Sequence, residues 1–83
     1  MPRVIDEGGF RLSVWPNDHP PPHVHAFKDS AECLVVIGEP DGGPASLYEN
    51  RGMKDKDWKA AVELVQKYQA EALVKWRETR ADT

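Results

Sequence analysis

The chain contains a single cysteine, Cys33, and no run of apolar residues long enough to cross a bilayer. One thiol cannot form an internal disulfide, and a membrane-spanning helix needs about 20 consecutive apolar residues. A positively charged start followed by an apolar stretch, the mark of an export signal, is also missing. We therefore expect a cytoplasmic protein without membrane association.

Basic residues are outnumbered, with 11 Lys and Arg against 14 Asp and Glu, which gives a net charge of −3. This balance disfavours nucleic acid as a partner, because non-specific affinity for it comes from clustered cations that release counterions. The 83 residues suffice for one hydrophobic core. We expect a single domain over residues 1–83, with β hairpins in residues 1–48 and a helix in residues 55–80.

The first β hairpin is expected from two β-prone runs, Arg3–Asp6 and Phe10–Trp15, which flank Glu7-Gly8-Gly9. Glycines that adopt positive φ are what a tight turn between strands requires. In the second run apolar and polar residues alternate, which predicts one buried face and places Trp15 on the other face. The residues expected on the buried face are Phe10, Leu12 and Val14.

A second hairpin is expected between His23–Lys28 and Glu32–Ile37, joined by a three-residue turn, Asp29-Ser30-Ala31. The second of these strands is apolar on both faces, so we expect it to be the central strand. In this register Cys33 lies diagonal to His25 on one face, where the two could form a catalytic couple. A shift of one residue would send Cys33 to the other face.

The last third of the chain reads as an amphipathic helix over residues 55–80, preceded by a short strand, Ala45–Tyr48. Trp58 and Trp76 are five helical turns apart, so both should face the core. The predicted fold class is therefore α+β, a small antiparallel sheet of four to five strands packed by one long C-terminal helix.

All three histidines of the chain lie in His19-Pro20-Pro21-Pro22-His23-Val24-His25, within a proline-stiffened loop expected over residues 16–25. If His23 begins a strand, His23 and His25 share a face about 6–7 Å apart along the chain, which suits one divalent metal ion. A polyproline run would hold His19 about 12 Å from His23. A third ligand then needs a bent loop or a carboxylate such as Asp18.

Three interpretations of this segment stay open. In the first, the imidazoles fix the proline loop by hydrogen bonds, and His25 packs at the sheet edge. In the second, His23 and His25 are acid–base residues or metal ligands of a small ribonuclease or hydrolase, aided by Asp18 or Arg11. In the third, which requires no cofactor, the segment is a binding surface. That surface would consist of Trp15, His19, Pro21, His23 and His25.

Four segments together resemble the bacterial family called domain of unknown function 4160: Gly9-Phe10-Arg11, the histidine heptapeptide, Arg51-Gly52-Met53-Lys54 and Trp76-Arg77-Glu78. Members of that family often stand beside a second uncharacterised family, numbered 2442, in an arrangement similar to toxin–antitoxin pairs. The resemblance implies a partner-binding component of a two-gene module. Its partner would be the product of the neighbouring gene or a second copy of the chain, and no catalytic residue is implied.

Overall fold

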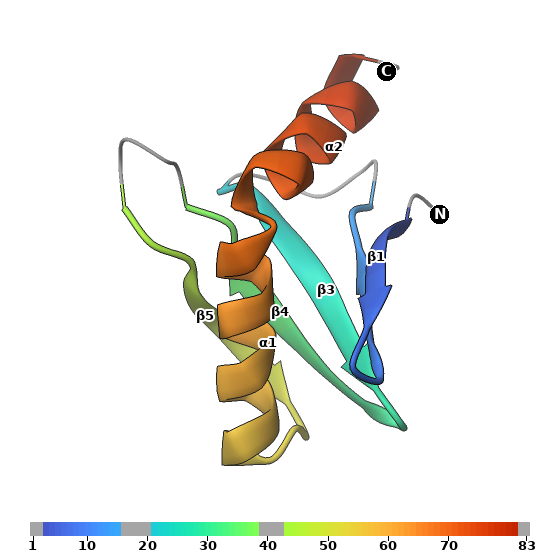
Figure 1. Cartoon of the computed structure of the whole chain (residues 1–83), viewed down its shortest axis with the longest axis vertical. Helices are drawn as coiled ribbons and strands as arrows, with labels where there is room; N and C mark the ends of the chain where they lie inside the picture. The colour runs from blue at the N-terminus through green and yellow to red at the C-terminus, as the bar shows by residue number, and fades with distance from the viewer. Residues whose placement is uncertain (1–2, 16–20, 39–42, 82–83) are drawn as a thin grey trace.

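The computed structural model describes residues 3–15, 21–38 and 43–81, and it has an α+β fold (Figure 1). The strands pair as one antiparallel meander in the order β1-β2-β3-β4-β5. The α+β prediction is thus confirmed, with two helices in place of one. The elements are β1 (Arg3–Glu7), β2 (Phe10–Ser13), β3 (His23–Lys28), β4 (Ala31–Val36), β5 (Ser46–Arg51), α1 (Asp55–Lys67) and α2 (Gln69–Ala81).

The first hairpin forms where it was predicted, with a turn of two residues. Gly8 and Gly9 adopt φ values of 60° and 84°, which residues with a Cβ rarely adopt. Glu7 therefore pairs directly with Phe10. The expected core face is confirmed, because its three residues are buried while Trp15 is exposed, but Ser13 on the other face is also fully buried, so the strand has more than one buried face. The buried residues of this run include Phe10, Leu12 and Val14.

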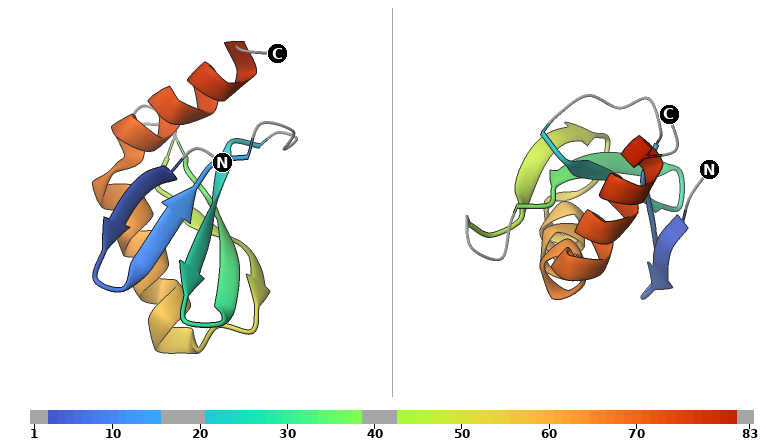
Figure 2. Two further views of the ribbon diagram at one scale, coloured as in Figure 1. Left: turned by 90° about the vertical axis from the view of Figure 1, so that its right-hand side faces the viewer. Right: turned by 90° about the horizontal axis from the view of Figure 1, so that it is seen from above.

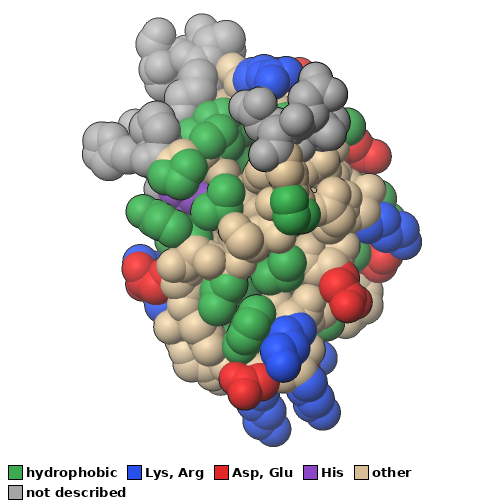
Figure 3. Space-filling model, turned by 90° about the vertical axis from the view of Figure 1, so that its left-hand side faces the viewer, with side chains coloured by type: hydrophobic (Ala, Val, Ile, Leu, Met, Phe, Trp, Pro, Cys, Tyr) green, Lys and Arg blue, Asp and Glu red, His purple; other side chains and the backbone are tan. Residues whose placement is uncertain are grey.

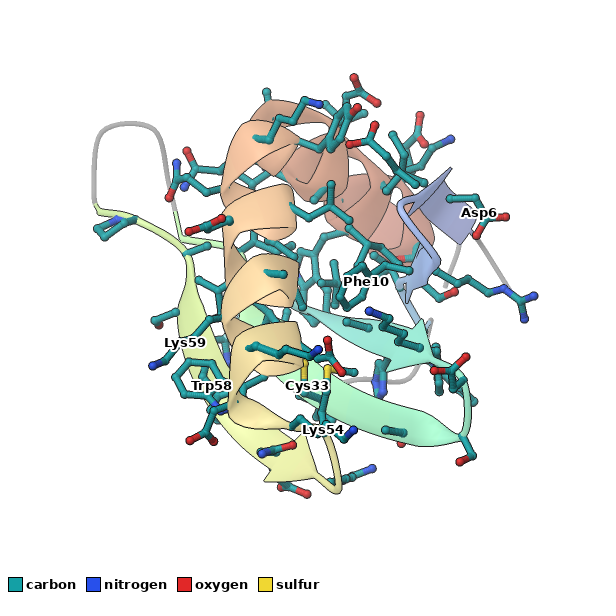
Figure 4. All side chains as sticks on the ribbon, turned by 60° about the horizontal axis from the view of Figure 1, so that its bottom comes forward. Asp6, Phe10, Cys33, Lys54, Trp58 and Lys59 are labelled. Carbon is teal, nitrogen blue, oxygen red and sulfur yellow. The ribbon has the colours of Figure 1, made fainter. Side chains whose placement is uncertain are left out.

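The second hairpin also forms, but its predicted register is wrong by one residue. The turn has two residues because Asp29 takes the left-handed conformation (φ 54°), which aspartate tolerates, and Lys28 therefore pairs with Ala31. Cys33 then pairs with Ala26 on the core face, and Figure 4 shows it beneath α1. The predicted couple of Cys33 with His25 is excluded, and β3 rather than β4 is the central strand.

The helix predicted over residues 55–80 is interrupted at Tyr68, which has φ −109° and ψ 26°. The Tyr68 hydroxyl donates a hydrogen bond to Glu7 of β1. Immediately after it, the Gln69 amide donates to two backbone carbonyls of the segment that follows β4, at 3.0 and 3.1 Å. These contacts with the sheet redirect the chain, so that α2 is inclined to α1 (Figure 2).

β5 runs three residues further than the predicted strand Ala45–Tyr48, to Arg51. Gly52 then turns the chain with φ 92°. The Asn50 side chain accepts from the Met53 amide (2.8 Å) and donates to the Met53 carbonyl (2.9 Å), which fixes the approach to α1. The expectation that the strand pattern ends before Asn50 was therefore wrong.

Both helices lie on one side of the sheet (Figures 1 and 2), and the core fills the space between. Trp76 is buried and Trp58 packs half-buried against the core, as their spacing predicted. No helix among the described residues covers the other side of the sheet, which we call the open face. In the same residues, no helix is both long and apolar enough to span a membrane.

Candidate functional site

The histidines lie on the open face because of the pairing of three strands. Ser13 of β2 pairs with His25 of β3, and His25 pairs with Leu34 of β4. Directly opposed residues of antiparallel strands point to the same side of a sheet, so these side chains form one row. His23 and Val36 lie in the neighbouring row on one side. On the other side, Arg11, Phe27 and Glu32 form a third row.

His23 is the first residue of β3 and is 5% exposed. Its Nδ1 lies 2.8 Å from the carbonyl oxygen of Pro21. A carbonyl can only accept, so Nδ1 carries the hydrogen of this contact. The interpretation that an imidazole fixes the proline segment by a hydrogen bond is thus confirmed for His23.

His25 is 8% exposed and is held by a side chain rather than by the backbone. Its Nδ1 lies 2.8 Å from Oε2 of Glu32, and Nη1 of Arg51 lies 3.7 Å from Oε1 of the same carboxylate. Hydrogen bonding to Glu49, and then the charges of Glu49 and Glu32, raise the pKa of the Arg51 guanidinium. The carboxylate therefore sits between a permanent cation and the His25 ring, which is central in the sheet and not at its edge.

Aromatic rings surround both histidines. The ring centroid of His25 lies 5.1 Å from that of Trp15 and 5.5 Å from that of His23. The His23 ring in turn lies 5.4 Å from Tyr48 and 5.4 Å from Trp76. We call these five residues the ring row. Its histidines are buried, whereas Trp15 is 41% and Tyr48 52% exposed.

The structure brings together four of the residues predicted to form a binding surface, namely Trp15, Pro21, His23 and His25. His19 and Asp18, the predicted third ligand and its substitute, lie outside the described residues, as do residues 16–20 of the predicted loop, whereas residues 23–25 of that loop belong to β3. Arg11 pairs with Asp6 at 3.9 Å. Sequence reasoning also missed four residues that contact this group directly or, in the case of Arg51, through Glu32. They are Glu32, Tyr48, Arg51 and Trp76.

Glu32 could have been found if the turn at Asp29 had been predicted with two residues instead of three. The two-residue turn places Glu32 opposite Phe27 and diagonal to His25. Trp76 carried a helical-period signal that indicated only the core. No sequence signal linked Tyr48 or Trp76 to His23, because those contacts depend on how distant elements pack.

The described residues limit two kinds of chemistry, metal binding and nucleophilic attack by a thiol. They contain no group of three or more His, Cys, Asp or Glu side chains arranged to hold a metal ion. Burial, with a smaller effect of Glu32, raises the pKa of the Cys33 thiol to about 11, so this thiol is a poor nucleophile at neutral pH. A cavity of about 420 Å³ lies between the turns of the two hairpins and includes Arg11 and Phe27 in its wall.

Comparison with known protein families supports the resemblance drawn from the sequence. A family model described as "Domain of unknown function (DUF4160)" matches residues 9–77, which is most of the chain. Neither the curated proteins nor the solved structures gave a significant match.

Proposed function

We propose, from the premise that this chain belongs to the DUF4160 family of unknown function, that it is a partner-binding component of a two-gene module similar to toxin–antitoxin pairs. The observation that carries the proposal is the open face. There Trp15 and Tyr48, two of the most exposed large hydrophobic side chains among the described residues, flank the buried histidines. On the side that β5 borders, hydrophobic side chains gather near a histidine (Figure 3).

Tryptophan and tyrosine are suited to this role. They are enriched among the residues that dominate the free energy of protein–protein binding. Here the two histidine rings pack between them, so a partner would meet a firm aromatic surface whose groups are already ordered. An ordered surface loses little side-chain entropy on binding.

The edge of the sheet at β5 supplies a second contact. β5 is the last strand in the sheet order, and five of its six residues are exposed. An edge strand can pair with an extended segment of another chain through backbone hydrogen bonds. We therefore assign the partner as the small protein encoded by the neighbouring gene, with an extended segment along β5 and apolar side chains against Tyr48.

Co-purification with the neighbouring gene product, followed by titration calorimetry, tests this proposal. Trp15→Ala and Tyr48→Ala should each weaken binding at least about tenfold, the effect of losing an interface anchor. Val74→Ala is the matched control, because Val74 is 50% exposed but lies on α2. Three outcomes would contradict the assignment. They are a monomer that does not bind the neighbouring gene product, a complex of only two copies of this chain, and an equal loss of binding affinity in the Val74→Ala control.

One observation favours a second candidate, a histidine-dependent ribonuclease or hydrolase. The Glu32 carboxylate accepts from His25 Nδ1, which orients the imidazole. His23 is close enough, at 5.5 Å between ring centroids, to act as the second acid–base group. The net charge of −3 weighs against a polyanionic substrate such as RNA.

Expression of the chain alone in a bacterial host distinguishes this candidate. An enzyme of a toxic module should arrest growth, and the His23→Ala/His25→Ala double variant should relieve the arrest while retaining the native circular dichroism spectrum. Ser13→Ala, a change beside His25 that removes no acid–base group, is the control. Normal growth with both the native chain and the double variant would remove the support for an enzyme.

A further inference from the structure

The bend between α1 and α2 is produced by contacts with the sheet rather than by the local sequence. Residues 55–79 contain neither glycine nor proline, the residue types that most often end or kink a helix. The helical hydrogen-bond pattern is kept on both sides of Tyr68, because its N–H donates to the Leu64 carbonyl at 3.1 Å and its carbonyl accepts from the Ala72 N–H at 2.9 Å. The local sequence therefore favours one continuous helix.

Side-chain contacts from three consecutive residues hold the bend. Glu7 of β1 accepts hydrogen bonds from the Tyr68 hydroxyl and from Lys67 Nζ, the latter at 3.1 Å. The Gln69 amide donates to two carbonyls of the segment that follows β4. Figure 2 shows the resulting inclination of α2 to α1. Few bonds therefore oppose the straightening of this segment at Tyr68.

A straightened segment would carry α2 away from its own sheet. The two helices have 13 residues each, so a continuous helix made of both would be about 40 Å long at 1.5 Å per residue. The longest dimension of the folded chain is only 33 Å. In the bent form Ala72, Leu73 and Trp76 of α2 are at most 6% exposed, and straightening would bring them into water. Their burial then requires the matching surface of a second copy.

We propose that two copies of this chain exchange their α2 helices through straightening at Tyr68. Each α2 docks where the other copy's α2 lies in the monomer, so the core contacts are kept and those at the bend change. Reciprocal exchange between identical chains is a low-cost route to a closed two-fold dimer. Trp76, whose ring centroid lies 5.4 Å from that of His23, completes the ring row of the other copy. The proposal does not depend on the partner-binding function.

An apolar stripe next to the bend supports a second copy as the occupant. Ala70 and Val74 are four residues apart, so they share one side of α2. Both are exposed, Val74 to 50%, and they border a hollow of about 250 Å³ together with Glu71 and Lys75. In a two-fold dimer the two straightened helices approach each other near Tyr68, where this stripe would pack.

Size-exclusion chromatography with light scattering, after refolding at low and at high protein concentration, tests the exchange. The native chain should give a monomer and, at high concentration, also a dimer. Tyr68→Phe removes a hydrogen bond from each of the two bends and should raise the dimer association constant about fivefold. Tyr48→Phe, which removes the same group from β5, is the matched control and should leave this constant unchanged.

Ala70→Pro should act in the opposite direction. Residue 70 is the second residue of α2, and proline is tolerated in the first turn of a helix but not in its interior. The variant should therefore keep the bent monomer and lower the dimer association constant at least about 100-fold, because each straightened helix would contain the proline. Circular dichroism checks that the variant is folded.

Isotope-filtered NMR on mixed dimers identifies the exchanged helix even if the proline variant fails to fold. Dimers assembled from labelled and unlabelled chains should show a nuclear Overhauser effect between the Trp76 ring of one chain and the His23 ring of the other. Three outcomes would overturn the proposal. They are the absence of a dimer from both the native chain and Tyr68→Phe, a dimer in which this contact stays within one chain, and a folded Ala70→Pro variant that dimerises like the native chain.

The result is separate from that for partner binding. Exchange moves α2 and leaves Trp15, Tyr48 and β5 in place, so the isolated monomer and the isolated dimer can each be titrated with the neighbouring gene product. A chain that exchanges α2 but does not bind that product would contradict only the partner-binding function. A chain that binds the product but never forms a dimer would contradict only the exchange.

Discussion

Ser13 is fully buried at the centre of the open face, and its Oγ has no hydrogen-bond partner within the described part of the chain. A buried hydroxyl without a partner loses its bonds to water and gains nothing in return. We predict that Ser13→Ala leaves stability unchanged or raises it by up to about 1 kcal/mol. Urea unfolding measures the change, with Ser46→Ala at an exposed position of β5 as control. A loss above about 1 kcal/mol would show that the hydroxyl is bonded.

Cys33 makes the stability of the fold decrease at alkaline pH. Burial raises its pKa from 9.0 to about 11, so the unfolded thiol ionises before the folded one. The stabilisation from this group is complete below the unfolded pKa and is lost as the pH rises from 9.0 towards about 11. We predict that native protein loses roughly 2 kcal/mol relative to Cys33→Ala between pH 8 and pH 10.5.

Unfolding in urea at the two pH values measures this difference. Lysines and tyrosines titrate alike in both proteins, so their contributions cancel in the comparison. The thiol of the folded native chain should also resist alkylation at pH 8 and react once urea is added. Equal pH profiles for the two proteins would be inconsistent with a raised thiol pKa.

At the scale of the elements, the backbone conformation of the loop after β4 requires a glycine at position 38. Gly38 has φ 75°, and a Cβ placed on it would lie 2.7 Å from the carbonyl oxygens of both Gly43 and Pro44. Gly8 has φ 60° with nothing within 4 Å of such a Cβ. We predict that Gly8→Ala costs about 1–2 kcal/mol, for the left-handed backbone alone. Gly38→Ala should cost at least about 3 kcal/mol, because the clash with rigid backbone adds to it. Thermal unfolding of the two variants gives the comparison, and equal losses would contradict it.

The break between the helices depends on the amide of Gln69. Its Nε2 donates to two backbone carbonyls, those of Ile37 and Gly43. Gln69→Glu keeps the shape but replaces the donor with an oxygen that repels both carbonyls. We predict a loss of about 2–3 kcal/mol, measured by urea unfolding. Glu71→Gln, an isosteric change at an exposed position of α2, should change stability by less than about 0.5 kcal/mol. A similar loss in both variants would contradict the assigned role of Gln69.

The elements could be predicted from the sequence more reliably than their register. Alternation and glycines located the first hairpin, two β-prone runs around a short turn located the second, and periodicity located the helical segment and its core tryptophans. The sequence does not distinguish a two-residue turn from a three-residue turn at Asp29, since that choice depends on one residue in the left-handed conformation. The break at Tyr68 was also beyond prediction, because it depends on a contact with Glu7, which lies 61 residues away.

The same limit applied to the candidate site. His23 and His25 were recognisable because histidines spaced by one residue on a strand share a face. Glu32 became their neighbour only through the register of β3 with β4, and Trp76 only through the inclination of α2. Residue types and local spacing therefore identified the chemistry, while long-range packing decided what surrounds it.

At the scale of the whole molecule, the central strands are buried on both faces, with the helices on one side and the rings of Trp15, His23, His25 and Tyr48 on the other. Four consecutive residues of β3, from His23 to Ala26, are buried, as are Cys33, Leu34 and Val35 of β4. β5, at the edge, has no buried residue. A two-faced core in the middle and an exposed edge predict a gradient of local stability across the sheet.

Hydrogen exchange followed by mass spectrometry measures that gradient. We predict that the amides of β3 and β4 exchange last, close to the free energy of global unfolding, and that those of β5 exchange earlier through local opening. Addition of the neighbouring gene product should slow exchange in β5 and leave α1 unchanged, because a paired strand protects only the edge that it joins. Exchange from β5 as slow as from β3 in the isolated chain would show that the edge is already protected, and β5 would then offer no place for a partner strand.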